Sequence, residues 1–235
     1  ISKKFTIATG DRRVHMSTMR RTIATNMTES CQKTARLTNI TEVDMTKAIS
    51  KIHSSKEEKI SLSALVVKAC ALAIQEFDIV NTIVDGDDII YKAEINIGVA
   101  VDIPIGLVVP VIHQANTKNL LALTREIETF AEKASAGSLS KDEMSGGTFT
   151  VTNIGMLAVT SFTPIINYPQ TAIMGVGSIR RMPRYLDDDT EKIEPRNIMN
   201  LCLSYDHRVI DGAPAARFSM FVRNLLENPD VLFQG

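Results

Sequence analysis

The sequence contains no tryptophan, few aromatic residues and almost no net charge. Aromatic residues make up 5% of the 235 positions, and 26 Lys and Arg nearly balance 27 Asp and Glu, which gives a formal net charge of −1. A nucleic-acid-binding protein needs a basic surface for phosphates and, for single strands, aromatic side chains on which bases stack. The composition therefore argues against nucleic acid as a partner.

Cysteines and uninterrupted apolar runs are also scarce. The three cysteines, Cys31, Cys70 and Cys202, are widely separated and form no CxxC pair. We therefore expect a reducing compartment, no disulfide framework and no metal centre, with Cys70 and Cys202 as small buried hydrophobes. The most apolar stretch, residues 95–112, is broken by prolines, glycines and Asp102. These breaks exclude a membrane helix of about 20 residues.

The hydrophobic content of 44% is enough for a substantial core. Apolar spacing predicts helices over 16–30, 60–77 and 119–137, and a last helix that begins near Pro214. Alternating or β-branched runs predict strands over 37–46, 95–101, 106–112, 146–155, 171–179 and 197–205, with a hairpin turn at Asp85-Gly86. Because these elements do not alternate strictly, we predict an α/β fold in two layers, with helices packed on a mixed sheet. We interpret residues 1–235 as one domain.

One loop, "SYDHRVIDG" at 204–212, concentrates ionisable groups. His207 directly follows a predicted strand, and Asp211 and Gly212 lead into the last helix. A strand would hold the imidazole rigidly, and an ordinary pKa of about 6.5 lets it accept a proton at neutral pH. A histidine held by a backbone carbonyl, without a catalytic role, fits the bare pattern equally well. GxxxxGK[ST] and GxSxG motifs are absent.

The context of this loop resembles a known family. "LSYDHRVIDGAPAARF" is similar to the active-site signature of the dihydrolipoamide acyltransferases of 2-oxo acid dehydrogenase complexes, which share their fold with chloramphenicol acetyltransferase. "MRRTIATNMTES", "EVDMT", "INIGVAVDIPIGLVVPVI", "SGGTFTVTNIG" and "FTPIINYPQTAIMGVGSI" resemble other blocks of that family in the same order. The resemblance covers residues 14–233. It implies that fold and acyl transfer between coenzyme A and a dihydrolipoyl group.

The resemblance also assigns roles to residues. His207 would be the general base that takes a proton from a thiol, with its tautomer fixed by a backbone carbonyl. Thr152 would stabilise the oxyanion of the tetrahedral intermediate, and loss of such a donor costs on the order of 100-fold in rate. Asp211 would hold the catalytic loop in shape through an arginine. The candidates for that arginine are Arg20, Arg21 and Arg208.

Three further residues are assigned to the coenzyme A side. Thr163 and Met174 lie in the block that borders the coenzyme A channel, with core packing as an open alternative for Met174, and Arg208 is the third candidate. No metal is implied. The chain departs from many relatives at Ala35-Arg36, where they have a Pro-His pair.

The family resemblance implies partners and location as well. Relatives form homotrimers, with the histidine and the hydroxyl contributed by neighbouring subunits, and the trimers build a 24- or 60-subunit core. Decarboxylase and dihydrolipoamide dehydrogenase components bind relatives through domains that are absent from residues 1–235. The lipoyl-bearing domain of the relatives is absent from these residues too. We expect a prokaryotic cytoplasm or the mitochondrial matrix, and an acetyl or branched-chain acyl group rather than succinyl. The alternatives are a non-catalytic scaffold component and a free-standing acetyltransferase that uses coenzyme A.

Overall fold

Seven strands form one mixed sheet in the computed structural model, which describes residues 8–55, 59–104, 106–185 and 191–234. Six of them follow one another in the order β1 (Arg36–Asp44), β11 (Ile193–Asp206), β9 (Ala172–Val176), β8 (Phe149–Asn153), β4 (Ile97–Val99) and β7 (Val111–Ile112). The seventh, β10 (Arg180–Tyr185), pairs with β11. Strand β8 runs parallel to β4 and β9, and the other pairs are antiparallel. The predicted mixed sheet is confirmed.

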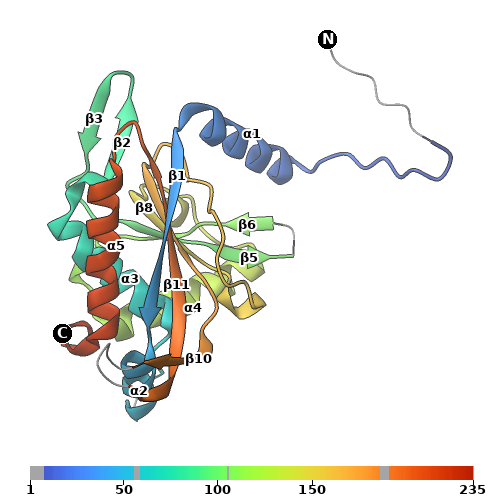
Figure 1. Cartoon of the computed structure of the whole chain (residues 1–235). Helices are drawn as coiled ribbons and strands as arrows, with labels where there is room; N and C mark the ends of the chain where they lie inside the picture. Colours follow the sequence, from blue (N-terminus) through green and yellow to red (C-terminus); the bar gives the residue numbers. More distant parts are fainter. Residues whose placement is uncertain (1–7, 56–58, 105, 186–190, 235) are drawn as a thin grey trace.

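Helices cover one face of this sheet (Figure 1). They are α3 (Leu62–Glu76), α5 (Gly212–Glu227), α4 (Leu120–Ala136) and the short α2 (Thr46–Ser54). Helix α5 packs on β1 and β11, and α3 packs between α4, α5 and β8. The core lies here, where Phe149 of β8 meets Phe218 of α5 with ring centroids 5.8 Å apart. The predicted end of α4 at Gly137 is confirmed, because Gly137 has a φ of 65°.

The segment 154–171 covers part of the opposite face. It contains no long helix or strand, but its polar groups are tied to the sheet. Ser178 N donates to Val159 O at 2.7 Å, and the Thr150 hydroxyl donates to Gln170 Oε1 at 2.6 Å. The two faces of the sheet are therefore chemically different, with helices on one side and a fixed loop on the other.

Helix α1 (Thr18–Lys33) projects from the body of the molecule, and an extended arm precedes it (Figure 1). Ser17 caps its N-terminus by accepting from Arg20 N. Its one buried residue is Ser30, which donates to Ile166 O at 2.6 Å. Val14 and Met16 in the arm are 68% and 57% exposed. The apolar stripe predicted for this helix is thus only partly covered within the chain: Met19, Ile23 and Met27 are half-buried, and Met16 is exposed.

The apolar stretch 95–112 differs from the prediction of two covered strands. Pro104 and Pro110 interrupt it, because proline supplies no N–H to a ladder. Only β4 and β7 join the main sheet, while β5 (Val101–Ile103) and β6 (Gly106–Val108) pair as a separate hairpin in which Leu107 is 48% exposed. The prediction of strands buried on both faces was wrong for this outer part.

The remaining elements are short. The predicted hairpin is β2 (Thr82–Asp85) and β3 (Asp88–Tyr91), and Gly86 in its turn has a φ of 60°. Short 3-10 turns are η1 (Asp78–Val80), η2 (Ala115–Thr117), η3 (Asp142–Met144), η4 (Gly155–Leu157) and η5 (Pro229–Phe233). No helix of the described chain is long and apolar enough to cross a membrane.

Candidate active site

His207 directly follows strand β11 and is exposed at that end of the sheet. The strand ends at Asp206, and the His207 N–H donates to Ala35 O at 2.9 Å, which joins the loop to the chain just before β1. The His207 side chain is 44% exposed, and its ring centroid lies 5.9 Å from that of Tyr205. Helix α5 begins at Gly212, directly after this loop. The imidazole therefore stands on a rigid base and remains accessible to a reactant.

The buried carboxylate of Asp206 holds this loop in shape. It is 1% exposed and accepts from Ala35 N and Arg208 N, both at 3.1 Å. The Arg208 guanidinium binds the same carboxylate through Nε at 3.0 and 3.1 Å and through Nη2 at 2.6 Å. This hydrogen bonding raises the pKa of Arg208. Asp206 directly precedes His207, and its carboxylate thus connects Ala35, just before β1, with Arg208, just after His207.

Among the residues that the structure describes, none is the arginine partner expected for Asp211. Its side chain is 84% exposed, and within the described residues its charged neighbour is His207, with Asp211 Oδ1 3.9 Å from His207 Nδ1. Arg208 is bound to Asp206, and Arg21 contacts Thr18. The reason is burial: the acid that a guanidinium holds is the one enclosed beside β1, whereas Asp211 faces solvent at the start of α5.

The His207 ring is less constrained than the resemblance implies. No hydrogen bond to either ring nitrogen is found within the described chain, and the 3.9 Å separation from Asp211 exceeds hydrogen-bond length. The carbonyl expected to fix the tautomer is therefore not among its contacts.

Thr152 lies on β8, on the face of the sheet away from the helices. Phe149 and Val151 point into the helical core, so the alternation along the strand turns Thr150 and Thr152 to the other face. The predicted hydroxyl-bearing face is confirmed. Thr152 is half-buried and is paired in register with Gly175 of β9.

His207 and Thr152 of one chain are too far apart to act on the same atom. Thr152 is in register with Gly175, Gly175 with Cys202, and His207 lies beyond Cys202 along β11. Two strand spacings of about 4.8 Å and roughly five residues at about 3.3 Å place the two Cα atoms on the order of 19 Å apart. A single chain therefore does not bring the His207 imidazole and the Thr152 hydroxyl to one carbonyl.

The other predicted residues divide between surface and core. Thr163 is exposed and follows the sheet-covering Phe162. Met174 is 0% exposed and belongs to the hydrophobic core, so its alternative role in packing is the one that its position supports. Arg208 lines a hollow of about 570 Å³, together with Lys33 and Tyr168.

Cys70 and Cys202 are fully buried, as predicted, and burial raises the pKa of both thiols. Among the described residues, no cluster of three or more His, Cys, Asp or Glu could hold a metal ion. Sequence reasoning missed the role of Asp206 in holding the loop that carries His207. The signal for Asp206 was its place at the end of a strand with Arg208 two residues later.

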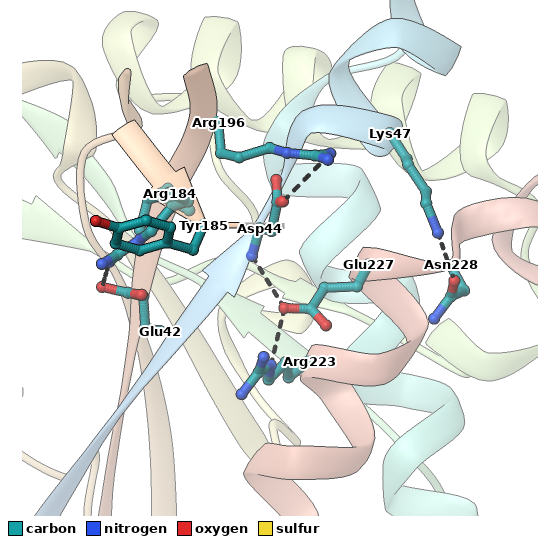
Figure 2. A pocket seen from close by; sticks show the side chains of 10 residues that line it. Glu42, Asp44, Lys47, Arg184, Tyr185, Arg196, Arg223, Glu227 and Asn228 are labelled. Atoms are coloured by element: carbon teal, nitrogen blue, oxygen red, sulfur yellow. Dashed lines mark hydrogen bonds and ion pairs between the residues drawn. The ribbon is translucent and has the colours of Figure 1, made fainter. Parts of the chain in front are cut away.

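A second hollow, of about 400 Å³, lies at the other end of β11 (Figure 2). Its carboxylates already have cationic or N–H partners. Glu227 binds Arg223 at 2.8 Å and the Asp44 N–H at 3.0 Å, and Asp44 lies 3.7 Å from Arg196. This ion-pair cluster fastens the end of β1 to α5 and β11, at a distance from His207.

Comparison with known proteins identifies the family. The model of the 2-oxoacid dehydrogenases acyltransferase (catalytic domain) family matches residues 8–234. The chain belongs to this family. A succinyltransferase component of the 2-oxoglutarate dehydrogenase complex from Arabidopsis thaliana is 39% identical over 230 residues, and its counterpart from Rickettsia typhi is 40% identical over 227. Both alignments cover 94% of this chain but 49% and 56% of those proteins, so the chain spans about half their length.

Solved structures agree with this assignment. A probable dihydrolipoamide acetyltransferase from Listeria monocytogenes has a TM-score of 0.90 at 36% identity, over 94% of this chain and 96% of that one. The dihydrolipoamide acetyltransferase of Azotobacter vinelandii has a TM-score of 0.92 at 33% identity, over 99% of each chain. Chloramphenicol acetyltransferase, 15% identical, has a TM-score of 0.56 over 86% of this chain and 94% of its own. The predicted chloramphenicol acetyltransferase-like fold is confirmed.

Proposed function

We propose that this chain transfers an acyl group between coenzyme A and a dihydrolipoyl group, as the catalytic core of a 2-oxo acid dehydrogenase complex. The observation that carries the proposal is the accessible His207 imidazole, held at the end of β11 by the buried Asp206. In the A. vinelandii acetyltransferase, one serine, one histidine and one asparagine were investigated for roles in the catalytic mechanism. That histidine and asparagine have the same spacing as His207 and Asp211 here.

The proposed reaction begins with proton transfer from a thiol to His207. A thiol has a pKa of about 8.5, so one neutral imidazole is a sufficient base. The thiolate attacks the thioester carbonyl of the other substrate, and the carbonyl oxygen takes up the negative charge. The Thr152 hydroxyl donates to that oxygen. Collapse of the intermediate expels the second thiolate, which takes the proton back from the imidazolium, while Asp211 lies 3.9 Å from the ring.

The active site would lie between two subunits. The separation of about 19 Å between His207 and Thr152 within one chain supports this arrangement, because the two groups would meet at one carbonyl only if they came from different chains. The exposed Val14 and Met16, and the half-buried apolar side chains of α1, offer apolar surface to a neighbouring copy. We propose a homotrimer, built into a larger core; one structural relative is the cubic core of a pyruvate dehydrogenase complex.

For the acyl group we propose acetyl or a small branched chain. The curated relatives bear succinyltransferase names, whereas two of the structural relatives bear acetyltransferase names. Thr163 and Arg208 remain the proposed contacts of coenzyme A. The lipoyl group would arrive on a separate domain, and the decarboxylase and dihydrolipoamide dehydrogenase would be partners through domains outside this chain, in a prokaryotic cytoplasm or the mitochondrial matrix.

The direct test is acyl transfer to dihydrolipoamide from acetyl-, isobutyryl-, isovaleryl- and succinyl-CoA. His207→Ala should abolish transfer, and Thr152→Ala should lower kcat by about 100-fold without changing the KM for coenzyme A. Thr152→Ser is the matched control, because it keeps the hydroxyl, and it should retain most activity. An intact oligomer that transfers none of these acyl groups would contradict the proposal and favour a scaffold.

A further inference from the structure

The ring of Phe162 stands end-on over the bare backbone of Gly175. A Cβ added to Gly175 would lie 2.7 Å from Phe162 Cζ and 3.1 and 3.2 Å from its two Cε atoms. These distances are too short for any side chain, so the glycine leaves the space that the ring fills. Phe162 itself is half-buried, so part of the ring remains accessible.

This ring lies next to Thr152. Thr152 and Gly175 are paired in register on parallel strands, so their side-chain positions lie on the same face of the sheet, about 4.8 Å apart. Because the ring end occupies the Gly175 position, it is about one strand spacing from the Thr152 side chain. The ring therefore forms one wall of the space in front of the threonine hydroxyl.

The wall is fixed in place from both sides. The Phe162 N–H lies beside the Cys202 sulfur on β11, where it opposes the rise that burial gives the pKa of that thiol. Two residues earlier, Thr160 O accepts from the Asn200 side chain at 3.3 Å, and its carbonyl lies against Gly177, where an added Cβ would be only 2.1 Å away. A segment packed this closely against two strands has little freedom to move the ring aside.

We infer that Phe162 is a specificity-determining residue, whose ring limits the acyl group beside Thr152 to a short, uncharged chain. The inference rests on the proposed function. A carbonyl oxygen bound by the Thr152 hydroxyl at about 2.7–3.1 Å brings the first acyl carbons to within about 5 Å of that hydroxyl, where the ring stands. A longer acyl chain would clash with the ring. A terminal carboxylate would be desolvated there without gaining a hydrogen-bond or ionic partner.

Two cations beside the catalytic loop could be considered as partners for such a carboxylate. Lys33 already binds Glu29 at 2.6 Å, and Arg208 is held by the buried Asp206. An acyl carboxylate would have to compete with both acids of the chain. The structure therefore favours selection by size and apolarity rather than recognition of a charged acyl group.

The test compares acyl chain length in Phe162→Ala, Phe162→Leu and the control Phe221→Ala. Phe221 is also a half-buried aromatic residue, but it packs on Phe77 on the helical face, with ring centroids 5.7 Å apart. The kcat/KM is measured for acetyl-, butyryl-, hexanoyl- and succinyl-CoA with dihydrolipoamide. One misfit methylene is worth about 10- to 200-fold. Phe162→Ala should therefore raise the hexanoyl-to-acetyl ratio at least about 10-fold, Phe162→Leu less, and Phe221→Ala should leave it unchanged.

The possible outcomes separate this inference from the function on which it rests. An active Phe162→Ala enzyme with an unchanged ratio overturns the inference and leaves the proposed function standing, and so does a wild type that prefers succinyl-CoA. A wild type that transfers no acyl group overturns both. If the alanine variant does not assemble, the leucine variant decides: a raised ratio supports the inference, and an unchanged one overturns it.

Discussion

Replacing the buried Asp206 by asparagine should weaken both the fold and catalysis. The side chain is 1% exposed and binds two backbone N–H groups, of Ala35 and Arg208, in addition to the Arg208 guanidinium. Asparagine keeps one oxygen for the N–H groups but loses the charge that holds the guanidinium. Alanine loses every one of these contacts.

The magnitudes follow from these contacts. A hydrogen bond to a charged group contributes about 1.5–3 kcal/mol net, and the Arg208 side chain is 45% exposed, so solvent screening reduces that figure. Asp206→Asn should therefore lower the free energy of unfolding by about 1–2 kcal/mol. Asp206→Ala also leaves two N–H groups without acceptors, and its cost should reach about 3–5 kcal/mol.

The effect on catalysis comes from the position of His207. A misplacement of about 1 Å can cost on the order of 100-fold in rate, so kcat should fall by about 10- to 100-fold in Asp206→Asn. The KM for coenzyme A does not report the position of His207, because the variant also releases the guanidinium of Arg208, a proposed coenzyme A contact. Urea unfolding and steady-state acyl transfer measure the two effects separately.

Glu227→Gln provides a matched control. Glu227 also binds one backbone N–H and one arginine, at 3.0 and 2.8 Å, but at the far end of β11 (Figure 2). It should lower stability and leave kcat unchanged. If Asp206→Asn retains the wild-type kcat, or if Glu227→Gln lowers kcat equally, the idea that Asp206 positions His207 is refuted.

Two further predictions concern stability. Hydrogen bonds from Lys133 and from the Ser140 N–H lower the pKa of Glu143 to about 2. The contribution of Glu143 to the free energy of unfolding is therefore present above its unfolded-state pKa of about 4.5 and is lost as the pH falls from there toward 2. The difference in urea midpoint between wild type and Glu143→Gln should shrink across that pH window, and a constant difference would contradict the assignment. Gly177→Ala forces a Cβ to within 2.1 Å of Thr160 O and should cost at least about 1–3 kcal/mol in thermal or urea unfolding, whereas a wild-type midpoint would show that the loop can move away.

The sequence predicted the structure correctly where a single residue or a local pattern determines it. Gly137 ends α4 because it adopts a positive φ, and the alternation over β8 correctly turned Thr152 away from the core. Spacing also predicted α3, in which ten of the 15 residues are buried. The stretch 95–112 was harder, because an apolar run does not reveal which of its pieces joins the main sheet and which extends as a separate hairpin.

The site was less predictable because it depends on contacts between distant segments. Sequence alone assigned the loop-holding role to Asp211, but the choice between the two acids depends on which is enclosed by Ala35 and the start of β1. The contact of Phe162 with Gly175 was likewise invisible until β9 and the segment before it were placed together.

The central claim is that His207 of one subunit acts with Thr152 of another. Co-expression of His207→Ala and Thr152→Ala chains in equal amounts tests it, because each variant alone lacks one group at every site. If the groups come from neighbouring chains, random assembly places an intact pair at about a quarter of the interfaces, and acyl transfer should recover to about 25% of the wild-type kcat. Activity no greater than the sum of the two variants measured separately would contradict the shared site.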